Sequence, residues 1–231
     1  MLSSPFDATA VDFMASMNMP AYKVASYEIT DLPLIRRIAR LHKPVILATG
    51  VAYLTDIERA LAVCREEGNE DVLLMKCVSA YPTPYEDIHL NMMPTLGRTF
   101  GCLTGLSDHS MGNAVATAAT ALGARMIEKH LTLRRADGGP DGSFSMEPEE
   151  FADMVKNIRA VEKALGDSDY HLTPVQVVEH GDCRSLFAAK DIAAGEELTP
   201  ENVRSVRPGN GLHTMYYEEI LGKKAACAIK K

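Results

Sequence analysis

The sequence predicts an α/β protein, a partial (β/α)8 barrel that lacks its first strands and is followed by a small second domain. Two observations support this fold class. Short apolar runs alternate with amphipathic stretches from residue 22 to residue 131, as expected for repeated βα units. Polar residues gather where the apolar runs end, and the carboxyl ends of the strands form the active face of such a barrel.

Five apolar runs are predicted to be strands, because each is too short for a typical helix and several are bounded by Gly, Pro or Asp. Continuous apolar strands are typical of a parallel sheet that is covered on both faces. The runs cover residues 22–26, 45–49, 72–77, 102–106 and 125–130.

Helices are predicted between and after these strands. Residues 55–67 carry apolar side chains at helical spacing after Thr55, a residue suited to the N-cap. Residues 113–122 form an alanine-rich helix that Gly123 would close, and residues 148–165 form a long helix.

A doubly wound nucleotide-binding sheet is the alternative to a barrel. No G-x-G-x-x-G motif follows any predicted strand, and the sequence contains no P-loop. Five strands cannot close an eight-stranded barrel, and residues 2–7 could supply only the tail of a sixth. We therefore favour the partial barrel and expect the chain to begin within that domain.

The domain limits are predicted as a barrel over residues 1–166, a linker over 167–183 and a second domain over 184–231. In the last of these, residues 184–196 indicate a strand and a tight turn, and residues 198–203 a capped helical turn. A module of fewer than about 50 residues holds little core. We expect it to lean on a neighbour and to end before its last strand.

Composition excludes several classes of partner. A formal charge of -7 argues against nucleic acid and anionic membrane surfaces. The sequence contains neither an apolar run long enough for a membrane span nor a signal peptide. Five scattered cysteines without a CxxC motif fit a reducing compartment. We predict a cytoplasmic protein.

Two histidines are candidate metal ligands, because His109 and His130 each end one of two consecutive predicted strands. Neighbouring strands lie about 4.8 Å apart, so both imidazoles could reach one ion at about 2.1 Å. Either histidine alone would be interpreted as a polar loop residue. Two nitrogen ligands leave a metal open to substrate, which favours Mn²⁺ over structural zinc, with Mg²⁺ or Co²⁺ as alternatives.

Further polar residues lie at or near strand ends. Lys23 with Ser26 could bind a phosphate or carboxylate, although a Schiff-base lysine and a solvated rim lysine stay open. Ser79 and Tyr81 occupy a loop stiffened by two prolines. Without other information, Asp141 belongs to a glycine-rich turn and Arg207 to the solvated surface.

Together these segments resemble the sialic acid synthase family over essentially the whole chain. The motifs that carry the resemblance, in order, are Ser4-Pro5-Phe6-Asp7, Tyr22-Lys23-Val24-Ala25-Ser26, Leu47-Ala48-Thr49-Gly50, Tyr81-Pro82-Thr83-Pro84, Leu106-Ser107-Asp108-His109, Ile127-Glu128-Lys129-His130, Gly139-Pro140-Asp141 and Val206-Arg207-Pro208-Gly209.

The resemblance implies a metal-dependent condensation of phosphoenolpyruvate with an acetamido sugar, in a barrel followed by an antifreeze-like (SAF) domain. It implies a domain-swapped homodimer when the protein is full length. By resemblance, the metal ligands are His109 and His130. By the same resemblance, phosphoenolpyruvate is bound by Lys23, Ser26, Ser79 and Ser107. The sugar is faced by Tyr81, Asp141 and the partner chain's Arg207. The catalytic candidates are Lys23, Tyr81 and Asp141.

Within the family, Tyr27 and the run Gly142-Ser143-Phe144-Ser145 resemble the pseudaminic acid synthases. The sugar would then be 2,4-diacetamido-2,4,6-trideoxy-L-altrose, for which a more apolar wall is favourable. An N-acetylneuraminate or legionaminic acid synthase is the alternative. An inactive truncated fragment is a third hypothesis, and we predict that the 231-residue chain alone releases little or no phosphate.

Overall fold

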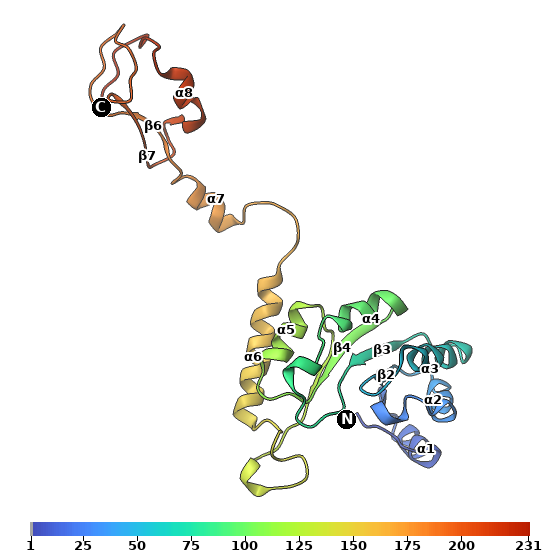
Figure 1. Ribbon diagram of the computed structural model, residues 1–231. Coiled ribbons are helices and arrows are strands. Elements are labelled where there is room, and N and C mark those ends of the chain that lie inside the picture. The colour runs from blue at the N-terminus through green and yellow to red at the C-terminus, as the bar shows by residue number, and fades with distance from the viewer. Residues whose placement is uncertain (1) are drawn as a thin grey trace. The chain divides into compact units, whose positions relative to one another are not determined.

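The computed structural model describes residues 2–231, and the chain divides into two compact units over residues 1–166 and 167–231 (Figure 1). Each unit is described here by itself. Among the described residues, no helix is both long and apolar enough to cross a bilayer.

A five-stranded parallel sheet forms the centre of the first unit. Its strands pair in chain order, and each hydrogen-bonds to the next one along the sequence. The strands are β1 (Tyr22–Val24), β2 (Val45–Ala48), β3 (Val72–Lys76), β4 (Leu103–Asp108) and β5 (Ile127–Lys129). The predicted partial barrel is confirmed. Residues 2–7 are not a strand and meet the sheet through one backbone hydrogen bond, from the Lys23 N–H to the Ser3 carbonyl.

One helix precedes the first strand, the others follow strands along the chain, and the helices lie around the outside of the sheet (Figure 1). They are α1 (Ala8–Ser16), α2 (Leu32–Ala39), α3 (Leu54–Glu66), α4 (Met92–Phe100), α5 (Ala114–Ala121) and α6 (Pro148–Leu165). Short 3₁₀ turns lie at Ser26–Glu28, Tyr85–Asp87 and Arg135–Asp137. The bounds predicted for the long last helix are confirmed.

Side chains at the helix ends account for the helix limits. Asp31 caps α2 by accepting from the Leu34 N–H at 3.1 Å, a contact that typically contributes about 1 kcal/mol. The predicted cap of α3 is wrong, because the helix starts before Thr55. Asp56 instead accepts from the N-cap N–H of Tyr53 at 3.0 Å. The side chain that accepts at this helix start therefore lies inside the helix and not at the N-cap.

The two faces of the sheet have different partners. Alternate side chains such as Val45, Leu47 and Leu74 are buried in the main core, which α2 and α3 help to form. Their neighbours Ile46 and Met75 pack in a smaller cluster on the other face, because successive residues of a strand point to opposite faces. Where the strands end, this second face becomes polar.

The second unit is a small antiparallel sheet with its own core. The strand order is β7-β6-β8, and Leu186, Ile192, Val203 and Ala225 are buried together. Its elements are α7 (Pro174–His180), β6 (Ser185–Ala188), β7 (Val203–Val206), β8 (Leu212–His213), a 3₁₀ turn (Thr214–Tyr216) and α8 (Tyr217–Ile220). The predicted linker therefore contains a helix, which Thr173 caps by accepting from the Gln176 N–H.

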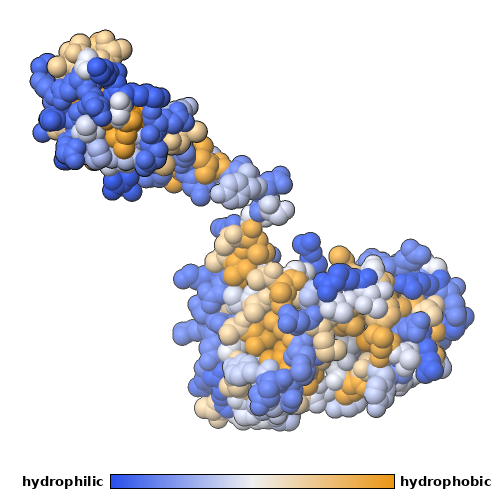
Figure 2. Space-filling view, turned by 45° about the horizontal axis from the view of Figure 1, so that its top comes forward, coloured by the Kyte–Doolittle hydropathy of each residue, from blue (hydrophilic) through white to orange (hydrophobic). Residues whose placement is uncertain are grey.

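Apolar side chains also reach the surface of the first unit. Figure 2 shows an apolar area, in orange, on the visible face of this unit. Leu103 and Leu133 are 59% and 78% exposed. Large contiguous apolar areas are uncommon on soluble monomers.

Candidate active site

A lysine, a serine and a glutamate converge at the carboxyl end of the sheet. The Lys23 Nζ atom, on β1, donates to Glu128 Oε1 on β5 at 2.5 Å. The Ser107 Oγ atom, on β4, donates to the same oxygen at 2.7 Å. Lysine has three donors, and the contact with Glu128 uses one of them. The others are free to bind an anion.

These contacts keep Glu128 ionised. Burial raises the pKa of its carboxyl, but the hydrogen bonds from Lys23 and Ser107 outweigh burial and hold the pKa below its ordinary value. A charged pair at a partly buried strand end is typical of a functional site.

A second cluster lies at the ends of β1, β2 and β3. The Gly50 N–H donates to Ser26 Oγ at 3.0 Å. A Cβ atom on Gly50 would lie 2.5 Å from Ser79 Oγ and 2.8 Å from Ser26 Oγ, so only glycine fits between the two hydroxyls. These two serines therefore face one small space.

Two buried polar atoms lack a partner among the described residues, Ser79 Oγ and Glu28 Oε2. Buried polar atoms without a hydrogen bond are rare and call for an explanation. Both follow strands of the sheet, β3 and β1. A bound polar ligand would account for the free hydroxyl of Ser79.

The two predicted histidines lie side by side, with ring centroids 5.3 Å apart. Each immediately follows its strand, β4 or β5. The His109 Nδ1 atom lies 2.8 Å from the Val78 carbonyl oxygen. Because a carbonyl can only accept, Nδ1 is the donor in this bond, and in a neutral imidazole this leaves the lone pair on Nε2. Burial, followed by the proximity of His109, lowers the pKa of His130 and favours its neutral form.

This donor set fits a divalent ion bound by two imidazoles. Imidazole nitrogen suits several divalent ions, and Mn²⁺ in particular is suited by the oxygen ligands that substrate and water would add to two imidazoles. Rings whose centroids are 5.3 Å apart are close enough to share one ion at about 2.1 Å from each nitrogen. Among residues 2–231, no three His, Cys, Asp or Glu side chains converge as a metal-binding group. The protein would leave the remaining coordination positions to substrate or water.

Aromatic side chains enclose the histidines. Tyr81 lies over His109 with ring centroids 4.2 Å apart. The buried Phe144 ring is 5.1 Å from His130 and 5.5 Å from Tyr81. The exposed Asp141 carboxylate is 3.5 Å from His130 Nδ1. This end of the site is therefore less polar than the lysine and serine end.

The structure brings most of the predicted site residues together in the first unit. Arg207 follows β7 in the second unit and is exposed, so its contact with the sugar stays a prediction. The sequence prediction missed Glu128 as the shared acceptor of Lys23 and Ser107, and Gly50 as the space between Ser26 and Ser79. Glu128 lies two residues before His130, a position on the same face that could have indicated it.

The model of the NeuB family matches residues 1–170, and the model of the SAF domain matches residues 184–231. The chain belongs to the NeuB family. The resemblance to sialic acid synthases is thereby confirmed, as is the presence of an SAF domain.

Named relatives of this NeuB family member include sugar acid synthases. A pseudaminic acid synthase of Helicobacter pylori is 45% identical over 99% of this chain and 67% of the relative. An N,N'-diacetyllegionaminic acid synthase of Campylobacter jejuni is 40% identical over 100% of this chain and 70% of the relative. The chain spans about two thirds of the length of these relatives.

A solved structure has the same fold. The spore coat polysaccharide biosynthesis protein SpsE of Bacillus subtilis superposes with a TM-score of 0.68 at 35% identity, covering 99% of this chain and 70% of the other.

Proposed function

We propose that this NeuB family member is a nonulosonic acid synthase that condenses phosphoenolpyruvate with an acetamido sugar. The observation that carries the proposal is the adjacent pair His109 and His130 beside Lys23 and three serines at the strand ends. The named synthases among its relatives support the same reaction class.

Phosphoenolpyruvate would bind at the lysine and serine end of the site. Lys23 supplies a positive charge, and Ser79 supplies a buried hydroxyl oxygen that has no hydrogen-bond partner within bonding distance among the described residues. Ser26 and Ser107 complete a set of hydroxyl groups suited to phosphate and carboxylate oxygens. Glu128 would keep the ammonium of Lys23 at the strand ends when the ligand is absent.

His109 and His130 would hold the divalent metal, for which Mn²⁺ is our first choice. When bound, such an ion supplies Lewis-acid polarisation of an aldehyde oxygen. The hydrogen bond to the Val78 carbonyl orients the His109 ring and leaves Nε2 as the nitrogen that would hold the ion. Tyr81 covers one face of that ring and limits the access of water.

The sugar would lie at the aromatic end of the site, beside Tyr81 and Asp141. Phe144, which is 7% exposed, adds an apolar wall, and Tyr27 lies near the end of β1 with an exposed ring. A sugar with a methyl group in place of a hydroxyl suits such a wall. We therefore propose pseudaminic acid as the product.

The reaction balances without an external redox partner. Carbon C3 of phosphoenolpyruvate attacks the aldehyde carbon of the open-chain sugar and forms the new carbon-carbon bond. Water adds at C2 of the resulting oxocarbenium ion, and the bond between C2 and the phosphate oxygen breaks. The products are a nine-carbon 2-keto acid and inorganic phosphate.

Two further properties complete the proposal. The protein would act in the cytoplasm as a homodimer in which Arg207 of one protomer reaches the acetamido group bound by its partner. In such a domain-swapped dimer, the proposed domain limits are 1–166 for the barrel, 167–183 for the linker and 184–231 for the SAF domain.

Phosphate release with different sugars tests this function. With the full-length protein, we expect Mn²⁺-dependent release from phosphoenolpyruvate and 2,4-diacetamido-2,4,6-trideoxy-L-altrose. Release should be at least about 10-fold slower with N-acetylmannosamine or the legionaminic acid precursor, because one changed group typically alters discrimination by 10- to 200-fold. Turnover of N-acetylmannosamine alone would contradict the proposed sugar. Release by the 231-residue chain itself would rule out the inactive fragment.

Substitution of Gly50 tests the phosphoenolpyruvate end. Gly50→Ala would place a methyl group 2.5 Å from Ser79 Oγ, so both serine hydroxyls must move. We expect phosphoenolpyruvate affinity, measured calorimetrically with Mn²⁺ present, to fall about 10-fold, the effect of one lost hydrogen bond to a charged group. Gly97→Ala on α4 is the matched control, since a Cβ there would meet its nearest atoms, in Cys102 and Thr104, only at 3.3 Å. Unchanged affinity in Gly50→Ala would argue against an anion between the two serines.

A further inference from the structure

A buried ion pair lies on the opposite side of the strands from the proposed active site. The Lys129 Nζ atom lies 2.7 Å from Asp108 Oδ2, and each side chain is 2% exposed. Ser107 and Glu128 come one residue earlier on the same two strands and hydrogen-bond to each other on the inner face. Successive side chains alternate between faces, so Asp108 and Lys129 lie behind the site and cannot contact substrate.

The polar atoms of this pair have several partners. Asp108 Oδ1 accepts from the Ser110 N–H at 2.9 Å and from the Ser110 hydroxyl at 2.7 Å. Lys129 Nζ also donates to the Ser110 carbonyl at 2.5 Å. A buried ion pair is expensive unless such hydrogen bonds accompany it. Two apolar side chains would fill the same space without the free-energy cost of removing two charges from water. The charged pair is therefore expected to have a role beyond filling the core.

The position of the pair in the sheet indicates that role. Asp108 and Lys129 are the last register partners of β4 and β5, and His109 and His130 follow immediately, outside the strand pairing. No register pair of β4 and β5 therefore joins the two histidines directly, and their carbonyls accept instead from the Thr83 N–H at 3.0 Å and the Met146 N–H at 2.9 Å. Lys129 contacts the residues on both sides of His109, namely Asp108 and Ser110, and itself precedes His130.

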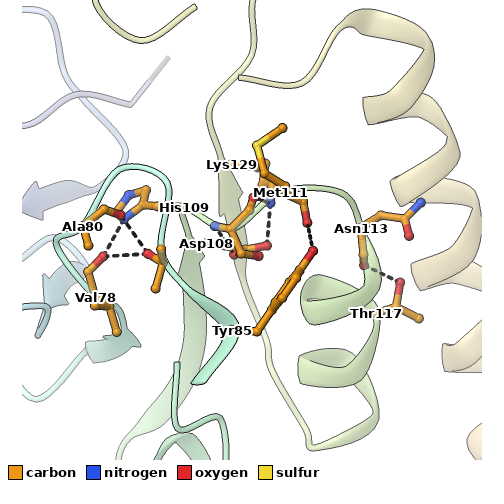
Figure 3. Close-up of polar contacts among 11 residues, drawn as sticks. Val78, Ala80, Tyr85, Asp108, His109, Met111, Asn113, Thr117 and Lys129 are labelled. Carbon is orange, nitrogen blue, oxygen red and sulfur yellow. Dashed lines mark hydrogen bonds and ion pairs between the residues drawn. The ribbon is translucent and has the colours of Figure 1, made fainter. Parts of the chain in front are cut away.

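Figure 3 shows the two sets of contacts around the end of β4. The His109 ring is directed towards Val78, while Asp108 and Lys129 meet each other. Tyr85 holds the following loop by donating to the Met111 carbonyl at 3.0 Å. The imidazole is thus oriented on one side by Val78, and its backbone is fixed on the other side by the ion pair.

We propose that Asp108 and Lys129 form a positioning clamp that sets the spacing of His109 and His130 for one divalent ion. This inference rests on the metal site of the proposed function. Groups that orient metal ligands from behind typically change metal affinity by about 10- to 100-fold when they are removed. The clamp differs from such groups in holding the backbone next to both ligands instead of an imidazole nitrogen.

The test is Mn²⁺ binding by the full chain, followed by the electron paramagnetic resonance signal of free Mn²⁺, with the melting temperature measured separately in chelator. The double variant Asp108→Asn/Lys129→Met removes both charges, so no buried charge is left unpaired. We expect it to fold and to bind Mn²⁺ about 10- to 100-fold more weakly than the unmodified protein. Asp108→Asn alone, which keeps an acceptor for Ser110, should lose affinity in the same direction.

Arg37→Met is the matched control. It breaks an ion pair with Asp12 at 2.5 Å on the surface of the same unit, and Mn²⁺ affinity should stay unchanged. A folded clamp variant that binds Mn²⁺ within about threefold of the unmodified protein would overturn the clamp and leave the metal site standing. Loss of folding in both clamp variants would assign the pair to global stability and overturn it as well. Absence of Mn²⁺ binding by the unmodified protein would overturn the metal site itself.

Discussion

Replacing His109 by alanine is expected to weaken Mn²⁺ binding by more than about 100-fold and to abolish Mn²⁺-dependent phosphate release. The site offers two imidazoles, so each substitution removes half of the protein's ligands. Loss of an outer partner alone costs about 10- to 100-fold in affinity, and loss of a ligand must cost more. His130→Ala should have the same effect. Equilibrium titration with Mn²⁺ gives the affinities directly.

A histidine outside the site provides the control for this experiment. His180 ends α7 in the second unit and is exposed, so His180→Ala should bind Mn²⁺ as the unmodified protein does. Retention of full affinity in either His109→Ala or His130→Ala would show that the two rings do not share an ion. The melting temperature of His130→Ala in chelator should change little, because the His130 side chain is one third exposed.

The fold was predictable because short apolar runs alternate regularly with amphipathic stretches along the chain. Each of the five strands was predicted from a short apolar run. The apolar side chains of such a run are expected to pack against the helices. The histidines could be paired for the same reason: consecutive strands of a parallel βα series are usually neighbours in the sheet. Their separation of 21 residues in sequence is therefore one strand spacing in the structure.

Contacts that depend on side-chain geometry could not be predicted in this way. Glu128 on β5 accepts a hydrogen bond from Lys23, which lies 105 residues earlier on β1, at the opposite edge of the sheet. No local sequence pattern indicates that these two side chains meet. Helix α7 was missed because its apolar residues, such as Val175 and Val178, are exposed and produce no core-facing stripe. Its capping box, from Thr173 to Gln176, was the available signal.

The orphaned hydroxyl of Ser79 illustrates the same limit. The sequence places it in a loop after β3, and only the structure reveals that its oxygen is buried and has no hydrogen-bond partner within residues 2–231. Its value as a candidate ligand for an anion thus comes from packing around Gly50, whereas its position after a strand came from the sequence.

Substitution of Lys23 should have the second large effect. Lys23→Met keeps an apolar stem of similar length and removes the charge that faces both Glu128 and the proposed anion. We expect phosphoenolpyruvate affinity, measured calorimetrically with Mn²⁺ present, to fall by about 100-fold or more, because truncating one partner of a partly buried charge pair costs 2–5 kcal/mol. Lys156→Met, on the exposed side of α6, should leave the affinity unchanged.

The same variant has a pH signature that separates an ion pair from a simple loss of packing. Hydrogen bonds from Lys23 and Ser107 overcome burial and hold the pKa of Glu128 below its ordinary value. The contribution of Glu128 to stability is therefore complete above the ordinary glutamate pKa of 4.5 and is lost as the pH falls through the lower folded pKa. The difference in melting temperature between Lys23→Met and the unmodified protein should thus be largest at neutral pH and narrow below about pH 4.5. A difference that is independent of pH would show that Lys23 contributes packing alone, and unchanged phosphoenolpyruvate affinity would remove it from the binding site.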